Sequence, residues 1–130
     1  MGLPEEEGMA RVTLALKQVR MEGYRERLSH HLSMGEKKRI AIATVLCMQP
    51  HVLVLDEPTS GLDPRARRAL MHLLRELPVS MLVSTHDMAL VNELFARMVI
   101  MDDGRIVADG NTQILMADGS LLQAHGLENP

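Results

Sequence analysis

Aromatic residues and cysteines are nearly absent from this sequence. Tyr24 and Phe95 are its only tyrosine, phenylalanine or tryptophan residues, 2% of the chain, so stacking platforms for nucleic-acid bases are not expected. A single cysteine, Cys47, cannot form a disulfide framework. The core must therefore consist of aliphatic side chains together with some of the 11 methionines.

Long runs of basic or apolar residues are absent as well. The 14 basic and 17 acidic residues give a formal net charge of -3, which does not favour binding to nucleic acid. The longest basic run, Lys37-Lys38-Arg39, is interpreted as a solvated helix face. No apolar stretch approaches the ~20 residues of a membrane-spanning helix, and residues 1–8 do not resemble a signal peptide. We therefore expect a cytosolic protein without direct membrane insertion.

The composition that is present is that of one globular domain. Of the 130 residues, 46% are hydrophobic and 24% are charged. Such a chain buries very roughly two thirds of its unfolded surface and needs no disulfide or metal to hold its core. The histidines are scattered, and no spacing among them or with Cys47 resembles a metal site.

The first half of the sequence predicts two helices. The first begins at Pro4, has acidic residues 5–7 in its first turn and ends near Gly23, with an apolar stripe at Met9, Val12, Leu16 and Val19. Residues 24–31 predict a polar connector. A second helix starts at Ser33 and Glu36, which have capping-box spacing, and it is apolar nearly all round, so we expect it to be buried.

The second half predicts an α/β fold. Residues 52–55, Val-Leu-Val-Leu, are typical of a central strand in a parallel sheet covered on both faces. Asp63 and Pro64 then start a helix with an apolar face up to Leu77, and residues 81–83 predict a second strand before a helix at residues 88–95. This alternation favours a mostly parallel sheet flanked by helices and joined by right-handed crossovers.

The pattern changes beyond residue 97. Residues 98–101 and 106–108 flank an Asp-Gly pair and predict an antiparallel β-hairpin. Asn111 or Thr112 is expected to cap a short helix, and residues 119–130 are expected to form a loosely held tail.

Two adjacent carboxylates, Asp56 and Glu57, end the aliphatic strand. Ligands of open α/β sheets bind outside such strand ends, so both acids are expected at a site. Because successive strand residues point to opposite faces, one acid can hold a hydrated Mg²⁺ while the other polarises an attacking water. An aliphatic run that ends in one acid is common, but the second acid and residues 58–63 behind it argue against a merely structural interpretation.

Two further positions could bind phosphate. At the start of the second helix, Ser33, Met34, Gly35 and Glu36 combine backbone N–H groups with the positive end of the helix dipole, and Gly35 permits close approach. His86 follows the second strand, where an imidazole can bond a terminal phosphate. Taken alone, the first segment is more simply a capping box, and a single histidine after a strand is more often a bystander.

Together and in this order, the segments closely resemble the C-terminal half of the nucleotide-binding domain of ABC-type ATPases. Residues 32–36 are similar to that family's signature motif, residues 52–57 to its Walker B strand, residues 60–63 to its D-loop and His86 to its switch histidine. The resemblance covers roughly residues 4–110.

Within that family, residues 30–43 and 2–5 look like the ATP-binding subunits of cobalt/nickel importers and of energy-coupling-factor vitamin importers. The resemblance implies a partial P-loop NTPase domain. Residues 1–49 would be part of the helical signature subdomain, and residues 50–130 the C-terminal part of the ATPase core. It also implies a transmembrane importer subunit as partner and a place at the inner face of the cell membrane.

The resemblance further implies ATP and Mg²⁺ as cofactors and a role for each matching residue. Asp56 would act on Mg²⁺, Glu57 would be the catalytic base and His86 would contact the γ-phosphate. Asp63 would lie at the interface with a second ATP-binding subunit.

By the same resemblance, Ser33, Met34, Gly35 and Glu36 would close over ATP held by that second subunit. Met34 stands where the family usually has glycine, and Glu36 stands where it usually has glutamine. Met34 could hinder the approach of phosphate, and Glu36 adds a negative charge near an anion site unless it turns back to cap the helix. We expect both to be tolerated.

The family's phosphate-gripping loop is missing. No stretch reads G-x-x-x-x-G-K-[ST], and the adenine-stacking aromatic and the glutamine-bearing loop are also missing. We therefore expect a fragment that begins just past these motifs. Sheet edges left unpaired by such a truncation are expected to drive dimerisation or higher association.

Two alternatives remain open. The C-terminal lobe of an SMC-type chromosome-maintenance ATPase also lacks the phosphate loop, but such lobes carry other residues after the two acids, and no heptad repeat is present here. A truncated, non-catalytic interaction module would keep the same motifs if the truncation were recent. The DNA upstream of the first codon would distinguish a fragment from a short protein.

We expect the isolated 130-residue chain to hydrolyse ATP negligibly, because phosphoryl transfer depends on positioning by the missing loop. The measurement is phosphate release by the purified chain with ATP and Mg²⁺. A Mg²⁺-dependent turnover that Glu57→Gln abolishes would show this expectation to be wrong.

Overall fold

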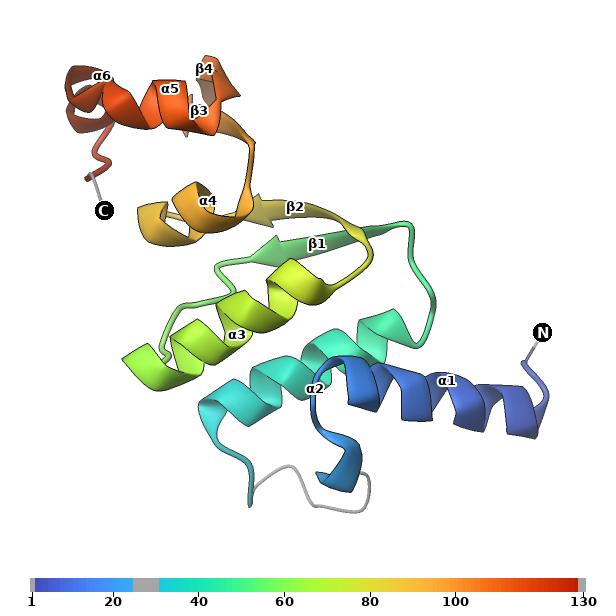
Figure 1. Ribbon diagram of the computed structural model, residues 1–130. Helices are drawn as coiled ribbons and strands as arrows, with labels where there is room; N and C mark the ends of the chain where they lie inside the picture. The colour runs from blue at the N-terminus through green and yellow to red at the C-terminus, as the bar shows by residue number, and fades with distance from the viewer. Residues whose placement is uncertain (1, 25–30, 129–130) are drawn as a thin grey trace. The chain divides into compact units, whose positions relative to one another are not determined.

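The computed structural model describes residues 2–24 and 31–128 and divides the chain into unit 1, residues 1–83, and unit 2, residues 84–130. Unit 1 contains α1 (Glu5–Gln18), the 3-10 helix η1 (Glu22–Tyr24), α2 (Met34–Leu46), β1 (Val52–Asp56), α3 (Pro64–Glu76) and β2 (Ser80–Ser84), whose last residue falls in unit 2 (Figure 1). Unit 2 contains α4 (Met88–Leu94), β3 (Arg97–Asp102), β4 (Arg105–Asn111), α5 (Thr112–Ala117) and α6 (Gly119–Ala124). The predicted connector at residues 24–31 lies mostly outside the described residues.

The first predicted helix is present as α1, but only its C-terminal part is buried. Leu16 is buried, whereas Met9 is 42% exposed, so the predicted apolar stripe is correct only at its end, because α2 covers only part of the helix. The helix also ends earlier than predicted. Its last residue is Gln18, and Arg20, at φ 57°, takes a left-handed conformation just beyond it.

The second predicted helix, α2, starts at the predicted capping box, but it is not buried all round. Its buried side chains are Ile42, Ala43 and Leu46, whereas Ala41 is exposed. The three buried residues share one helix face, and α2 packs against α1 and α3. An apolar composition on every side therefore overestimated the burial, since neighbouring helices cover only one face.

Strands β1 and β2 pair with each other and point in the same direction, and α3 connects them (Figure 1). This is the predicted parallel β-α-β arrangement. The prediction that both faces are covered is wrong: Leu53 is 1% exposed, but Val52, Val54 and Leu82 are 53%, 67% and 64% exposed. Alternate strand residues face opposite sides of a sheet, so in the described part of the chain only one face is covered.

The connecting helix α3 forms as its sequence predicts. Asp63 is the N-cap, and its Oδ1 accepts hydrogen bonds from the backbone N–H groups of Arg65 and Ala66, both at 2.9 Å. Pro64 occupies the first turn, where its missing N–H is not needed. The predicted apolar face is buried, with Leu74 fully inaccessible.

In unit 2, β3 and β4 form the predicted antiparallel hairpin. Asp103 and Gly104 have φ values of 46° and 72°, which suit a two-residue turn of type I′. The register shifts between Ile100 and Met101, so the hairpin contains a bulge. The described sheets are therefore one parallel pair and one antiparallel pair, and the expectation of a mostly parallel sheet holds only for β1 and β2.

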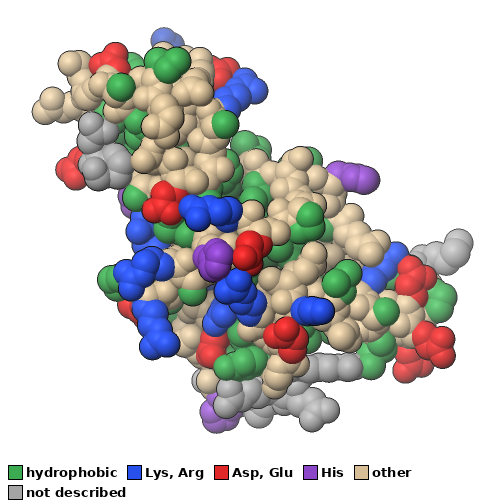
Figure 2. Space-filling model, viewed as in Figure 1, with side chains coloured by type: hydrophobic (Ala, Val, Ile, Leu, Met, Phe, Trp, Pro, Cys, Tyr) green, Lys and Arg blue, Asp and Glu red, His purple; other side chains and the backbone are tan. Residues whose placement is uncertain are grey.

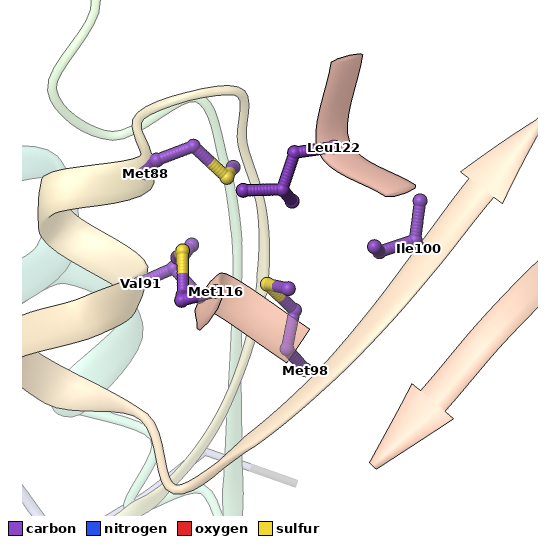
Figure 3. Packing of buried hydrophobic residues seen from close by; sticks show 6 residues of the cluster. All are labelled: Met88, Val91, Met98, Ile100, Met116 and Leu122. Atoms are coloured by element: carbon purple, nitrogen blue, oxygen red, sulfur yellow. The ribbon is translucent and has the colours of Figure 1, made fainter. Parts of the chain in front are cut away.

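The core of unit 2 combines methionines with aliphatic side chains, as the composition predicts. Side chains from α4, β3, α5 and α6 converge on it: Met88, Val91, Met98, Ile100, Met116 and Leu122 (Figure 3). Leu122 is 1% exposed and belongs to α6, which Asp118 caps through a 3.0 Å bond from the Leu121 N–H. The prediction of a loosely held tail is therefore wrong for residues 119–124, because a buried leucine anchors this segment.

Two neighbouring residues of β1 give a matched test of the finding that only one face of this strand is buried. Leu53→Ala should lower the free energy of unfolding by about 2–5 kcal/mol, because it removes a buried side chain. Val54→Ala, at an exposed position, should cost less than about 1 kcal/mol. Urea unfolding followed by circular dichroism measures both, and equal losses would contradict the one-sided burial of β1.

Candidate functional site

The two adjacent acids lie at the carboxyl end of β1, as predicted. Asp56 is the last residue of the strand and is exposed, whereas Glu57 is half-buried. Glu57 has φ 43°, so the chain turns away immediately after the strand. The strand alternation, from which the different directions of the two side chains were predicted, therefore ends at Asp56. The direction of the Glu57 side chain is set instead by the left-handed conformation of Glu57 itself.

The segment after Glu57 is a series of turns that leads directly into α3. The Glu57 carbonyl accepts a bond of 3.2 Å from the Ser60 N–H, and the Thr59 carbonyl accepts one of 3.3 Å from the Leu62 N–H. Thr59 is buried. Asp63 then caps α3, so one oxygen of its carboxylate already has a structural task.

At the start of α2, the capping box is complete. Ser33 Oγ accepts from the Glu36 N–H at 3.2 Å, and Glu36 Oε2 accepts from the Ser33 N–H at 2.8 Å. Glu36 thus turns back to cap the helix, the condition under which its charge was expected to be tolerated. The Ser33 N–H, followed by the Tyr24 hydroxyl, lowers the pKa of Glu36 below its ordinary value of 4.5. Met34 is 55% exposed beside this box.

Gly35 packs against the start of α3. A β-carbon at Gly35 would lie 3.1 Å from Ala66 Cβ and 3.9 Å from Leu62 Cδ2, and the first distance is too short for an ordinary contact. From the sequence, the expected role of this glycine was to let phosphate approach the backbone closely. The structure gives it another task, because it lets α2 approach α3 closely.

His86 is exposed and lies near the start of unit 2, two residues after the end of β2. The residues around it form a local turn: Thr85 Oγ1 accepts from the Asp87 N–H at 3.0 Å, and Asp87 Oδ1 accepts from the Leu90 N–H at 3.0 Å to cap α4. The other candidate residues all lie in unit 1.

Sequence reasoning missed Lys38. It is half-buried, and its Nζ donates to the Glu57 carbonyl oxygen at 3.2 Å, so the expectation of a solvated face is wrong for this residue. Lys37, its neighbour, is exposed as expected. Basic side chains gather over the starts of α2 and α3 in Figure 2, and no local signal distinguishes Lys38 from the others.

The chemistry of Asp56 fits a magnesium ligand. Within the described ranges, no group of three His, Cys, Asp or Glu residues could hold a metal ion. Mg²⁺, however, is commonly bound through one or two carboxylates together with substrate phosphates and waters. An exposed carboxylate at a strand end meets that requirement.

Comparison with known proteins identifies the family. The family model described as "AAA domain, putative AbiEii toxin, Type IV TA system" matches residues 5–92. The "Putative ABC transporter ATP-binding protein gll0289" of Gloeobacter violaceus is 54% identical over 121 residues, which are 92% of this chain and 50% of that protein. The "Energy-coupling factor transporter ATP-binding protein EcfA" of Methanothermobacter thermautotrophicus is 39% identical, over 100% of this chain and 43% of that protein.

A solved structure agrees with these relatives. The structure of cbiO1 from Clostridium perfringens, part of the ABC transporter complex cbiONQ, matches with a TM-score of 0.83 and 40% identity, over 95% of this chain and 51% of that one. This chain therefore belongs to the AAA-domain family of the matching model and to the ATP-binding domains of ABC transporters. It spans about half the length of the curated relatives that it matches.

The lowered pKa of Glu36 predicts a pH dependence of stability. The folded chain binds fewer protons here than the unfolded chain, so the capping interaction stabilises the fold above the ordinary glutamate pKa and is lost as the pH falls through the lowered value. Carboxyl NMR should show Glu36 titrating below 4.5. Ser33→Ala should cost about 1 kcal/mol at neutral pH. A Glu36 midpoint at or above its ordinary value would contradict the capping geometry.

Proposed function

We propose that this chain forms part of an ATP-binding and ATP-hydrolysing subunit of an ABC importer, for a metal ion such as cobalt or nickel or for a vitamin. The observation that carries the proposal is the similarity to EcfA at 39% identity and to cbiO1 at 40% identity. The acid pair at the end of β1 adds the carboxylates that such a subunit needs for phosphoryl transfer.

In this proposal, Asp56 and Glu57 have different tasks. Asp56 holds Mg²⁺, which supplies neutralising charge to the phosphates when it is bound. Glu57 is the catalytic base that orients and deprotonates the attacking water, and a fixed main chain keeps its carboxylate in place. His86, exposed at the start of unit 2, donates a hydrogen bond to the γ-phosphate.

The start of α2 is proposed to close over ATP bound by a second ATP-binding subunit. Although Ser33 Oγ accepts a bond from Glu36, its hydroxyl hydrogen can still be donated to a phosphate oxygen. The backbone of Met34 and Gly35 adds N–H groups at the positive end of the helix dipole. The Glu36 carboxylate stays directed at the backbone N–H of Ser33. Asp63 is proposed to lie at the interface between the two subunits.

The proposed partners are that second ATP-binding subunit and a transmembrane importer subunit, with no nucleic acid. No helix in the described part of the chain is both long enough and apolar enough to cross a bilayer. We propose that the protein acts in the cytoplasm, as a peripheral subunit at the inner face of the cell membrane.

The proposal is tested on the complete ATP-binding subunit, phosphate loop included, of which this chain is proposed to form part. The subunit is tagged, the membranes of the cells that produce it are solubilised in detergent, and the assembly is recovered by the tag. The assembly should contain a transmembrane subunit and hydrolyse ATP in a Mg²⁺-dependent manner. Glu57→Gln should lower kcat by about 100-fold or more, because the base is lost. Glu6→Gln makes the same chemical change at an exposed position of α1 and should leave kcat unchanged. Full activity of the Glu57→Gln assembly would refute the proposed role of Glu57.

A further inference from the structure

The main chain at Glu57 adopts a conformation that something must hold. Its φ of 43° lies in the left-handed region, which residues other than glycine adopt at a cost in free energy. Its carbonyl oxygen accepts two hydrogen bonds, from the Ser60 N–H and from Lys38 Nζ, both at 3.2 Å. The bond from Ser60 closes a local turn. The bond from Lys38 comes from α2, 19 residues away in sequence.

Lys38 is well placed to hold this carbonyl. A half-buried ammonium loses part of its hydration and must be compensated by an acceptor, which the Glu57 carbonyl provides. The helix that carries Lys38 is itself fixed just before the contact. The capping box orders its first turn, and Gly35 packs so closely against α3 that a β-carbon there would lie 3.1 Å from Ala66 Cβ.

We propose that Lys38 is a positioning residue for Glu57: its ammonium holds the Glu57 main chain in the left-handed turn and thereby directs the Glu57 carboxylate. This inference rests on the proposed function, since the direction of the carboxylate matters for turnover only if Glu57 is the base. The contact also joins the start of α2, proposed to meet the second subunit's ATP, to the acid pair of the same chain. A displacement of α2 is therefore transmitted to Glu57.

The contact is tested first on the isolated chain by backbone NMR. In Lys38→Met, the Glu57 and Ser60 resonances should move, with the Glu57 Cα and carbonyl shifts leaving left-handed values, and the Ser60 amide should exchange about fivefold faster. Lys38→Arg keeps a cationic donor and should restore the wild-type values. Lys37→Met removes the same charge from an exposed neighbour and should change none of them. If Lys38→Met does not fold, Lys38→Gln serves in its place.

The consequence for turnover is tested on the assembly. Lys38→Met should lower kcat about tenfold and leave the KM for ATP nearly unchanged, because it disturbs the base and not the binding of nucleotide. Lys38→Arg should recover most of kcat. Unmoved Glu57 resonances in Lys38→Met, or a change in KM alone, would overturn the proposal. Full hydrolysis by Glu57→Gln would instead overturn the proposed function. The NMR experiment shows whether Lys38 holds the Glu57 main chain, and its result does not depend on ATP hydrolysis.

Discussion

The close packing of α2 against the start of α3 is the constraint on which the candidate site depends. Gly35 allows the two helices to approach until Ala66 Cβ would touch a β-carbon, and Lys38 reaches the Glu57 carbonyl from the same helix. The chain between Glu57 and Ala66 is thus held at both ends. A segment fixed in this way can present a carboxylate with little reorganisation, which is what electrostatic catalysis requires.

The acidic residues near this segment divide into those with a structural task and those without one in the geometry described. Glu36 and Asp63 both cap helices, so each of their charges lies at a helix N-terminus, where the dipole stabilises it. Asp56 is exposed at a strand end. Two carboxylates of the region proposed to receive phosphate are thus directed at backbone N–H groups, so they repel an anion less than the sequence suggests.

Predictions from the sequence succeeded where contacts between neighbouring residues decide the structure. They failed where the burial of a side chain depends on another helix or strand packing against it. The capping box at Ser33, the N-cap at Asp63 and the turn at Gly104 each need only a few neighbouring residues, and all three were predicted. Which faces of α2 and β1 are covered was not predicted correctly, because an apolar side chain is buried only if another element lies against it. The tail was misjudged for the same reason, since nothing local shows that Leu122 completes a core.

The order and spacing of the motifs were sufficient to predict the family, because together they resemble the motifs of ABC-type ATPases. The sequence by itself therefore determined the family and the local caps and turns. Only the tertiary structure decided that Gly35 serves helix packing, that Lys38 faces inward while Lys37 faces solvent, and that Glu57 leaves the strand in a left-handed turn. These outcomes depend on contacts between residues far apart in the chain, which local patterns do not encode.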